Sequence, residues 1–367
     1  MKIQDSPENW RGDGSQVNPD ARYEQITPDD YDWQEGWQAF ETSIKSEARF
    51  FSRTAARQLD DLFATIGEMQ TRNGRPIIVD AGPETALTQL FRARVFQSTS
   101  QLETALARPD LSLAPPPSRL ASAGRMNAHG ISVFYGATEA GIALAEVRPP
   151  VGSHVMVARF DIARRVRLLD LTSLPDLMED GSIFDPQYAV RLGRMRFMKT
   201  LTRRMSRPVM PDDQMSDYLP TQAVADFLAT ESKTPLDGII FPSVQATGWG
   251  LNVVLFHKSS RVEELDIPKD TDISAQTHST DDEGPYPDFT VYEEVPPAER
   301  VPEEQKPRHP FMIPSSDWDD IAEGDYRETT LRIDPQAVWV HVIEGVKIET
   351  SQHKVSRHRW TKTDTPF

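Results

Sequence analysis

Between Leu90 and Phe256 the sequence consists of short apolar runs separated by turn-forming residues. Runs of this length bounded by turn signals are typical of β-strands. Two segments have helix-forming composition instead: Glu139–Val147, with Thr138 at the N-cap position, and Thr221–Thr230. The strands that we expect are Ile131–Tyr135, Val155–Phe160, Val166–Leu171, Ile239–Phe241 and Leu251–Phe256. This region therefore predicts an α+β fold built on a mixed β-sheet.

The N-terminal part of the chain has a different pattern. Residues 1–28 are polar and aperiodic, which predicts an irregular arm, and residues 29–86 form a helical region. Asn73 and Gly74 are expected to end the helical pattern. Its apolar stripe would pack on the following domain, pair with a second copy as a homodimer, or bind a partner. The stripe recurs at three- and four-residue steps through Trp33, Trp37, Phe40, Ile44, Phe51, Ala55, Leu59, Leu62 and Ile66.

The C-terminal part begins with a strongly acidic stretch. Residues 261–306 hold fourteen Asp or Glu against four Lys or Arg, a local balance of −10, together with six prolines. This composition predicts a solvated, poorly ordered linker over residues 261–310. Residues 311–367 form a C-terminal β extension in this reading, because Val338–Ile343 alternates as a strand does. The strand would join the sheet or form a small hairpin.

Composition excludes several classes of function. The chain of 367 residues contains no cysteine, which removes disulfides, thiol nucleophiles and cysteine-ligated zinc sites. Its eight histidines lack metal-binding spacing, so we expect no metal. A formal net charge of −16 opposes nucleic acid as a partner. The sequence contains no run of about 18 apolar residues, so we expect no membrane-spanning helix. The N-terminus lacks the apolar core of a secretory signal, which favours a cytoplasmic location.

Phosphate-binding glycine loops are also missing. The sequence has no GxGxxG or Walker-type motif, and outside the N-terminal arm its one close glycine pair is Gly248 and Gly250. A bound dinucleotide would therefore be held by side chains and isolated turns instead of a Rossmann crossover.

Three stretches carry a set of polar residues in a characteristic order. They are LFRARVF (Leu90–Phe96), GRMNAHGISVFYGATEAGIALAEVRP (Gly124–Pro149) and DGIIFPSVQATGWGLNVVLF (Asp237–Phe256). They supply an arginine, a tyrosine at the end of a strand, a glutamate at the end of a helix, and a serine. As a set this order resembles the RES domain over roughly residues 87–257. The resemblance makes residues 87–260 a catalytic domain, implies a core similar to the ADP-ribosyltransferase fold, and implies an enzyme that consumes NAD+ as its substrate.

The resemblance also implies roles for individual residues. Glu146, Arg92 and Ser243 match the catalytic positions. A carboxylate in the last turn of a helix opposes the helix dipole, and the neighbours of Glu146 are apolar, so we expect its side chain to enter a pocket. Ser243 is expected to hydrogen-bond Glu146 or the ribose, without acting as a nucleophile. The expected NAD+-binding residues are Arg94, Arg125, Tyr135 and Asn252, with Asn127 fixing the GRMN turn.

Several outcomes of one reaction remain open at this point. Transfer of the ADP-ribosyl group to water gives a glycohydrolase, to inorganic phosphate a phosphorylase, and to a protein side chain an ADP-ribosyltransferase. The resemblance implies a toxin or stress effector, which in many relatives is paired with an antitoxin that blocks the pocket. The alternative from another class is a non-catalytic protein-binding module on the same fold.

Overall fold

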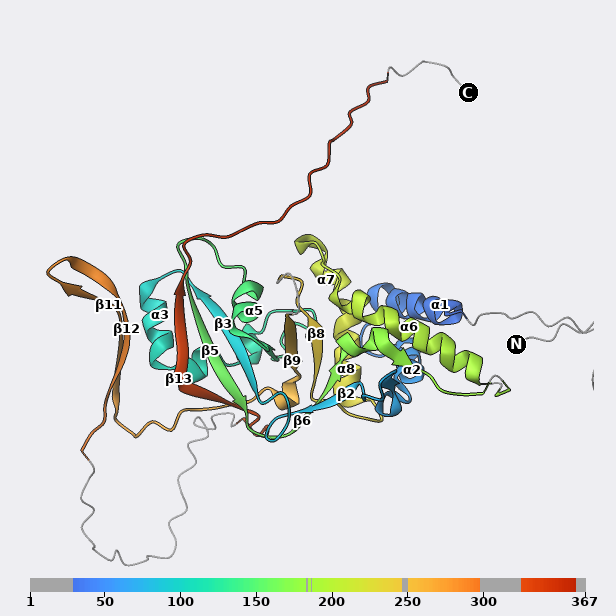
Figure 1. Ribbon diagram of the computed structural model, residues 1–367, viewed down its shortest axis with the longest axis horizontal. Coiled ribbons are helices and arrows are strands. Elements are labelled where there is room, and N and C mark those ends of the chain that lie inside the picture. The colour runs from blue at the N-terminus through green and yellow to red at the C-terminus, as the bar shows by residue number, and fades with distance from the viewer. Residues whose placement is uncertain (1–28, 183, 186, 246–249, 298–324, 361–367) are drawn as a thin grey trace, which may run out of the picture.

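The computed structural model describes residues 29–182, 184–185, 187–245, 250–297 and 325–360 (Figure 1). The predicted N-terminal arm, part of the linker and residues 311–324 of the β extension lie outside these ranges. The α+β prediction is confirmed, because helices pack on a large mixed sheet. No helix in the described ranges has both the length and the apolar character needed to cross a bilayer.

A nine-stranded sheet runs through the described part of the chain in the order β10-β13-β5-β3-β4-β9-β8-β6-β2. Two neighbouring pairs, β10 with β13 and β6 with β8, are parallel, and the other pairs are antiparallel. The strands are β2 (Ile78–Ala81), β3 (Gln89–Phe96), β4 (Phe134–Ala137), β5 (His154–Ile162), β6 (Val166–Asp170), β8 (Gly238–Pro242), β9 (Leu251–Leu255), β10 (Val262–Glu263) and β13 (Leu331–Val342). A separate pair joins β1 (Gln70–Thr71) to β7 (Leu177–Met178).

Alternating side chains of the central strands feed two cores. Ile239 and Phe241 of β8 enter the core on the face covered by the larger helices, whereas Ile240 enters the core on the opposite face. Short helices α3 (Thr99–Ala107) and α4 (Pro109–Ser112) cover the second face, and α5 (Ala140–Glu146) packs on β3 and β4. Every strand expected between Leu90 and Phe256 is present, although β4 begins three residues later than Ile131.

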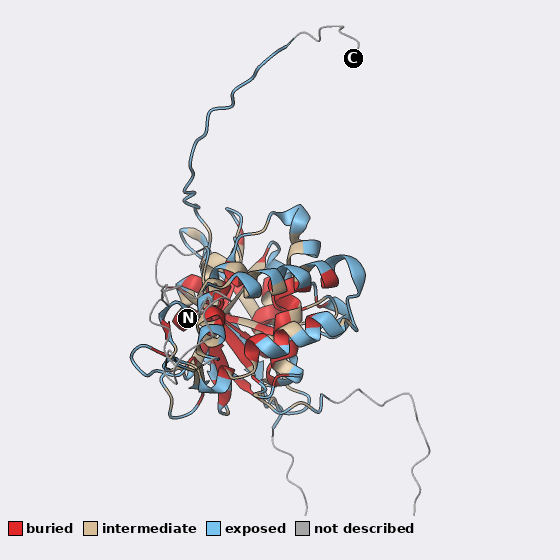
Figure 2. Cartoon of the chain, turned by 90° about the vertical axis from the view of Figure 1, so that its right-hand side faces the viewer, coloured by how far each residue is buried: buried red, intermediate tan, exposed pale blue. Residues whose placement is uncertain are grey.

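The N-terminal helices pack on this same chain. The predicted stripe divides between α1 (Tyr31–Thr42) and α2 (Arg53–Phe63), which lie against α6 (Tyr188–Ser206) and α8 (Leu219–Thr230). Figure 2 shows these helices with buried faces turned inward and exposed faces turned to solvent. The stripe that could have paired two copies is therefore occupied within one chain. Three details of the prediction are wrong. Phe51 is 94% exposed, and the helix ends at Phe63, ahead of Asn73. The last part of the predicted helical region 29–86 forms strands β1 and β2, and β2 belongs to the main sheet.

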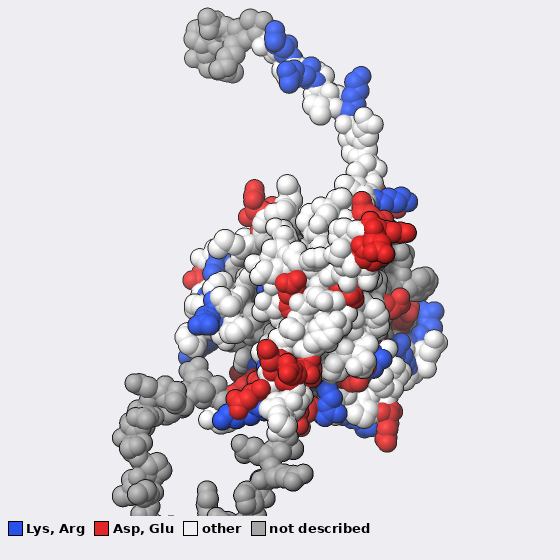
Figure 3. All heavy atoms as spheres, turned by 90° about the vertical axis from the view of Figure 1, so that its left-hand side faces the viewer, with Lys and Arg blue, Asp and Glu red and all other residues white. Residues whose placement is uncertain are grey.

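The acidic segment is partly ordered, which corrects the expectation of a disordered linker over 261–310. Strands β11 (Asp272–Asp281) and β12 (Gly284–Glu294) form an antiparallel hairpin that packs on α3. Ala275 and Phe289 reach the second core, so the hairpin is anchored by apolar contacts despite its charge. Figure 3 views the end of the molecule that carries this hairpin and shows several groups of Asp and Glu side chains.

The predicted C-terminal strand joins the main sheet. Strand β13 pairs with β5, with a register shift between Ile333 and Val338, and it begins seven residues ahead of the expected start. Trp339 of β13 lies 6.5 Å from the ring of Phe91 on β3. Residues 343–360 continue beyond the sheet without helix or strand.

A substitution in the shared core tests whether the N-terminal helices and the sheet unfold together. Leu59 is buried in the core that α2 shares with α1, α6, α8 and the sheet, so Leu59→Ala should lower the free energy of unfolding by about 2–5 kcal/mol. Arg57→Ala, on the exposed face of the same helix, should change it by less than about 0.5 kcal/mol. Urea denaturation followed by tryptophan fluorescence gives both values. A separate early transition of the helices in Leu59→Ala would contradict the single core.

Candidate active site

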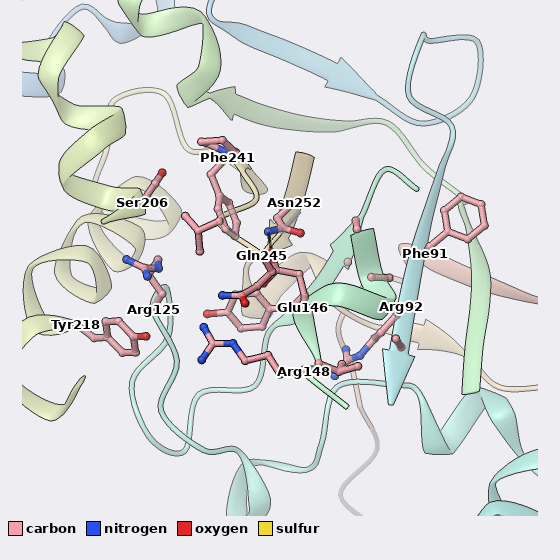
Figure 4. A pocket seen from close by; sticks show the side chains of 18 residues that line it. Phe91, Arg92, Arg125, Glu146, Arg148, Ser206, Tyr218, Phe241, Gln245 and Asn252 are labelled. Carbon is pink, nitrogen blue, oxygen red and sulfur yellow. Dashed lines mark hydrogen bonds between the residues drawn. The ribbon is translucent and has the colours of Figure 1, made fainter. Parts of the chain in front are cut away.

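A cavity of about 360 Å³ lies where β3, α5 and β9 face the loop that carries Arg125 (Figure 4). Its walls combine aromatic rings with a few charged groups. In Figure 4 Glu146 is near the centre, with Arg92 on one side and Arg125 and Arg148 on the other. The polar and aromatic lining residues are Phe91, Arg92, Arg125, Tyr135, Glu146, Arg148, Ser206, Tyr218, Phe241, Gln245 and Asn252.

Glu146 is the last residue of α5, as expected. Ile142 and Ala143 lie one turn before Glu146 on the same side of this helix, where they pack beside Phe91 and Ala93 of β3, and Ala143 lines the same cavity as Glu146. Two donors hold the same carboxylate oxygen: Ser243 Oγ donates to Oε1 at 2.5 Å, and Asn252 Nδ2 donates to it at 2.7 Å. Within the described residues Oε2 has no hydrogen-bond partner. The carboxylate is thus fixed through one oxygen while the other is available to a ligand.

The two donors come from neighbouring strands, which fixes their separation. Asn252 lies on β9 opposite Phe241 of β8, and Ser243 follows the end of β8 directly. The backbone nitrogen of Ser243 donates to the Gly250 carbonyl at 2.8 Å, which closes this end of the strand pair. The pairing of β8 with β9 therefore sets the positions of both residues that hold Glu146.

Arg92 lies in the middle of β3 and lines the same cavity. Its guanidinium carbon is 4.9 Å from the centre of the Phe134 ring, and its buried Nη1 has no hydrogen-bond partner. Burial, followed by the charge of Arg94, lowers the pKa of Arg92 to about 10, so the group stays charged at neutral pH. A buried cation with an unsatisfied nitrogen destabilises the empty protein and attracts an anion.

Arg94 does not reach this cavity, which corrects the expectation that it assists Arg92. Its Nη1 donates to the carbonyl of Ser112 at 2.8 Å, and its guanidinium lies 5.5 Å from the centre of the Phe96 ring. Ser112 ends α4, and a cation is favoured at the negative end of a helix. The Arg94 side chain therefore lies in a separate hollow, which is lined by residues of β3, α3 and α4.

The GRMN turn holds Arg125 against the helical layer. The Gly124 nitrogen donates to the Asn127 carbonyl at 3.0 Å, and a Cβ at Gly124 would lie 2.5 Å from Asn127 Oδ1, so the turn requires glycine there. Asn127 Nδ2 donates to three backbone carbonyls, which agrees with its expected role in fixing the turn. Arg125 Nη1 donates to the carbonyls of Met205 and Arg207 at 3.1 and 2.8 Å.

The hydroxyl of Tyr135 is hydrogen-bonded within the protein, and Tyr135 also lines the cavity. Its hydroxyl donates to Asn127 Oδ1 and accepts from the Met126 nitrogen, both at 2.9 Å. Burial raises the pKa of the Tyr135 phenol, so the hydroxyl remains neutral. The ring, and not the hydroxyl, is what Tyr135 offers to a ligand.

Sequence reasoning missed several lining residues. Tyr218 and Ser206 come from the helical layer, and only the folded chain brings them to β3 and α5. Gln245 follows Ser243 by two residues, and Arg148 follows Glu146 by two, so proximity to a predicted residue was the available signal. Within the described ranges no group of His, Asp and Glu residues is arranged to hold a metal ion.

A sequence model of the RES domain matches residues 89–286, which is more than half of the chain. The match begins at β3 and continues through β11 to the first residues of β12, beyond the end expected at residue 260. A comparison with curated proteins finds no match. At the level of the family, RES domains are associated with NAD-linked, toxin-like functions. On this match, and with the fold and the cavity residues in agreement, the chain belongs to the RES domain family.

Proposed function

We propose that the protein cleaves the bond between nicotinamide and ribose in NAD+, with water or inorganic phosphate as the acceptor. The observation that carries the proposal is the state of Glu146. Its Oε1 is held by Ser243 and Asn252, its Oε2 has no hydrogen-bond partner among the described residues, and Glu146 lines a cavity whose other charged lining groups are arginines. In this setting the protein would act in the cytoplasm as a toxin or stress effector.

The chemistry requires a single carboxylate. When the bond from the ribose anomeric carbon to the pyridinium nitrogen breaks, the electron pair leaves with nicotinamide, which departs neutral and needs no general acid. The sugar becomes oxocarbenium-like, and a fixed anion beside it lowers the energy of that state. Water or phosphate then bonds to the anomeric carbon, and a water proton passes to solvent. Glu146 is placed to stabilise the positive sugar and to hold its hydroxyls through Oε2.

The remaining cavity groups suit the other parts of NAD+. Arg92 carries the buried unsatisfied nitrogen, which an oxygen atom of the ligand would satisfy. The rings of Tyr135, Phe241 and Tyr218 offer apolar faces to the two bases. The cost of burying Arg92 without an anion supports a ligand-binding site over a module that uses only its outer surface.

Glu146→Gln tests the central role of the carboxylate. The amide oxygen can still accept from Ser243 and Asn252, so the side chain stays in place while its charge is removed. We expect nicotinamide release to fall by about 10²-fold or more, the loss typical of one electrostatic transition-state contact. The measurement is chromatographic detection of nicotinamide from NAD+, with and without inorganic phosphate.

Glu139→Gln is the matched control, because Glu139 is exposed at the other end of α5 and does not line the cavity. It should release nicotinamide at the wild-type rate. Absence of release by the wild-type protein with either acceptor would contradict the proposal. Transfer of labelled ADP-ribose to a protein, without turnover to free product, would replace it with the transferase.

Ser243→Ala tests whether Ser243 acts by positioning Glu146. Losing one hydrogen bond to a charged group should lower kcat by about tenfold, with KM changed by less than about twofold because ground-state binding is retained. Ser243→Thr keeps the hydroxyl and should recover most of kcat. A rise in KM with unchanged kcat would show instead that Ser243 binds the substrate directly.

A further inference from the structure

Arg148 has a backbone conformation that is unusual for its residue type. It follows the C-cap residue Val147 of α5, and its φ is 46°, in the left-handed region. The position after a helix C-cap commonly adopts this conformation, and glycine is the usual residue there because a Cβ strains the backbone. Because Arg148 has a Cβ, its backbone is strained in this conformation. Backbone strain of this kind is typical of functional positions, so the Arg148 side chain is a candidate for a functional role.

The strained turn brings the Arg148 side chain to the cavity. Arg148 lines it together with Glu146, and in Figure 4 its guanidinium lies on the same side of Glu146 as Arg125. No hydrogen bond or ion pair holds this guanidinium within the part of the chain that the structure describes. It therefore has all its donors available to a ligand.

Arg125 is its natural counterpart in the cavity. Arg125 Nη1 is bound to the Met205 and Arg207 carbonyls, and its guanidinium carbon is 5.1 Å from the centre of the Tyr218 ring, so the group is oriented. Its Nε and Nη2 make no hydrogen bond to described residues. Guanidinium groups bind phosphate through paired donors, and two of them on one wall fit two adjoining phosphates.

The charge of the cavity supports an anion of this size. Its described lining contains Arg92, Arg125 and Arg148 against one carboxylate, Glu146, a balance of +2 in a chain of −16. With Arg92 on the opposite side of Glu146, the two arginines of the other side form a separate cationic wall. The positive charges of Arg125 and Arg148 repel each other, and an anion bound to both would offset this repulsion.

We infer that Arg148 and Arg125 form a diphosphate subsite, which makes the site selective for dinucleotides with a diphosphate bridge over nicotinamide mononucleotide. The inference rests on the proposed function for the identity of the substrate. The subsite itself is a binding feature, and it can be measured without turnover. The strained backbone of Arg148 lowers the stability of the empty protein, while its guanidinium increases the affinity for the diphosphate.

Arg148→Gly separates the two effects, because glycine relieves the backbone while removing the guanidinium. We expect an unchanged or higher Tm together with ADP-ribose binding that is about tenfold to a hundredfold weaker by calorimetry. AMP, which has one phosphate, should lose much less affinity than ADP-ribose. In turnover, the ratio of kcat/KM for NAD+ over nicotinamide mononucleotide should fall by about tenfold.

Glu84→Gly is the matched control, since Glu84 also has a left-handed φ, 62°, and is exposed away from the cavity. It should leave Tm unchanged or raised and leave ADP-ribose affinity unchanged. Arg148→Lys keeps a charge but not paired donors, and its affinity should fall between wild type and Arg148→Gly.

The outcomes distinguish this inference from the proposed function. Wild-type affinity for ADP-ribose in Arg148→Gly, or equal losses for ADP-ribose and AMP, would overturn the subsite even if nicotinamide release is confirmed. No binding of ADP-ribose by the wild-type protein would also overturn it. Weakened binding in Arg148→Gly, in a protein that releases no nicotinamide, would support the subsite and reject the enzyme.

Discussion

The site depends on one interaction, in which two donors from adjacent strands hold a single oxygen of Glu146. The pairing of β8 with β9 sets where Ser243 and Asn252 lie, and the short helix α5 delivers the carboxylate to them. If both carboxylate oxygens were hydrogen-bonded within the protein, neither would be available to a ligand. If neither were bonded, the carboxylate group could rotate freely. Fixation through one oxygen leaves an oriented anion, which is the arrangement that preorganised electrostatic catalysis requires.

The helical layer completes the cavity and also stabilises the fold. Arg125 is fixed by carbonyls at the end of α6 and contacts the ring of Tyr218 beside α8. The same two helices bury the apolar faces of α1 and α2. The helices that hold Arg125 at the cavity are therefore the same ones that anchor the N-terminal helices in the core.

Local pattern was sufficient for much of the fold and for the centre of the site. Apolar runs identified the strands, and the order of Arg92, Glu146 and Ser243 identified residues that do converge. The acidic composition of the hairpin β11–β12 led to a wrong prediction of disorder. Ala275 and Phe289 anchor this hairpin by packing on core residues that are distant in the sequence. Arg94 was misplaced because a helix end competes for it. Tyr218 was missed because only folding brings it to the cavity, and the role of Arg148 depends on a backbone angle that composition does not reveal.

The most direct measurement of the central claim is a crystal structure of the Glu146→Gln variant with NAD+ bound. The account predicts that the side chain at 146 lies within hydrogen-bonding distance of the nicotinamide ribose, with Ser243 and Asn252 still donating to its oxygen. It also predicts that phosphate oxygens contact arginines of the same cavity. NAD+ bound elsewhere, or bound here with the adenine end at residue 146, would contradict it.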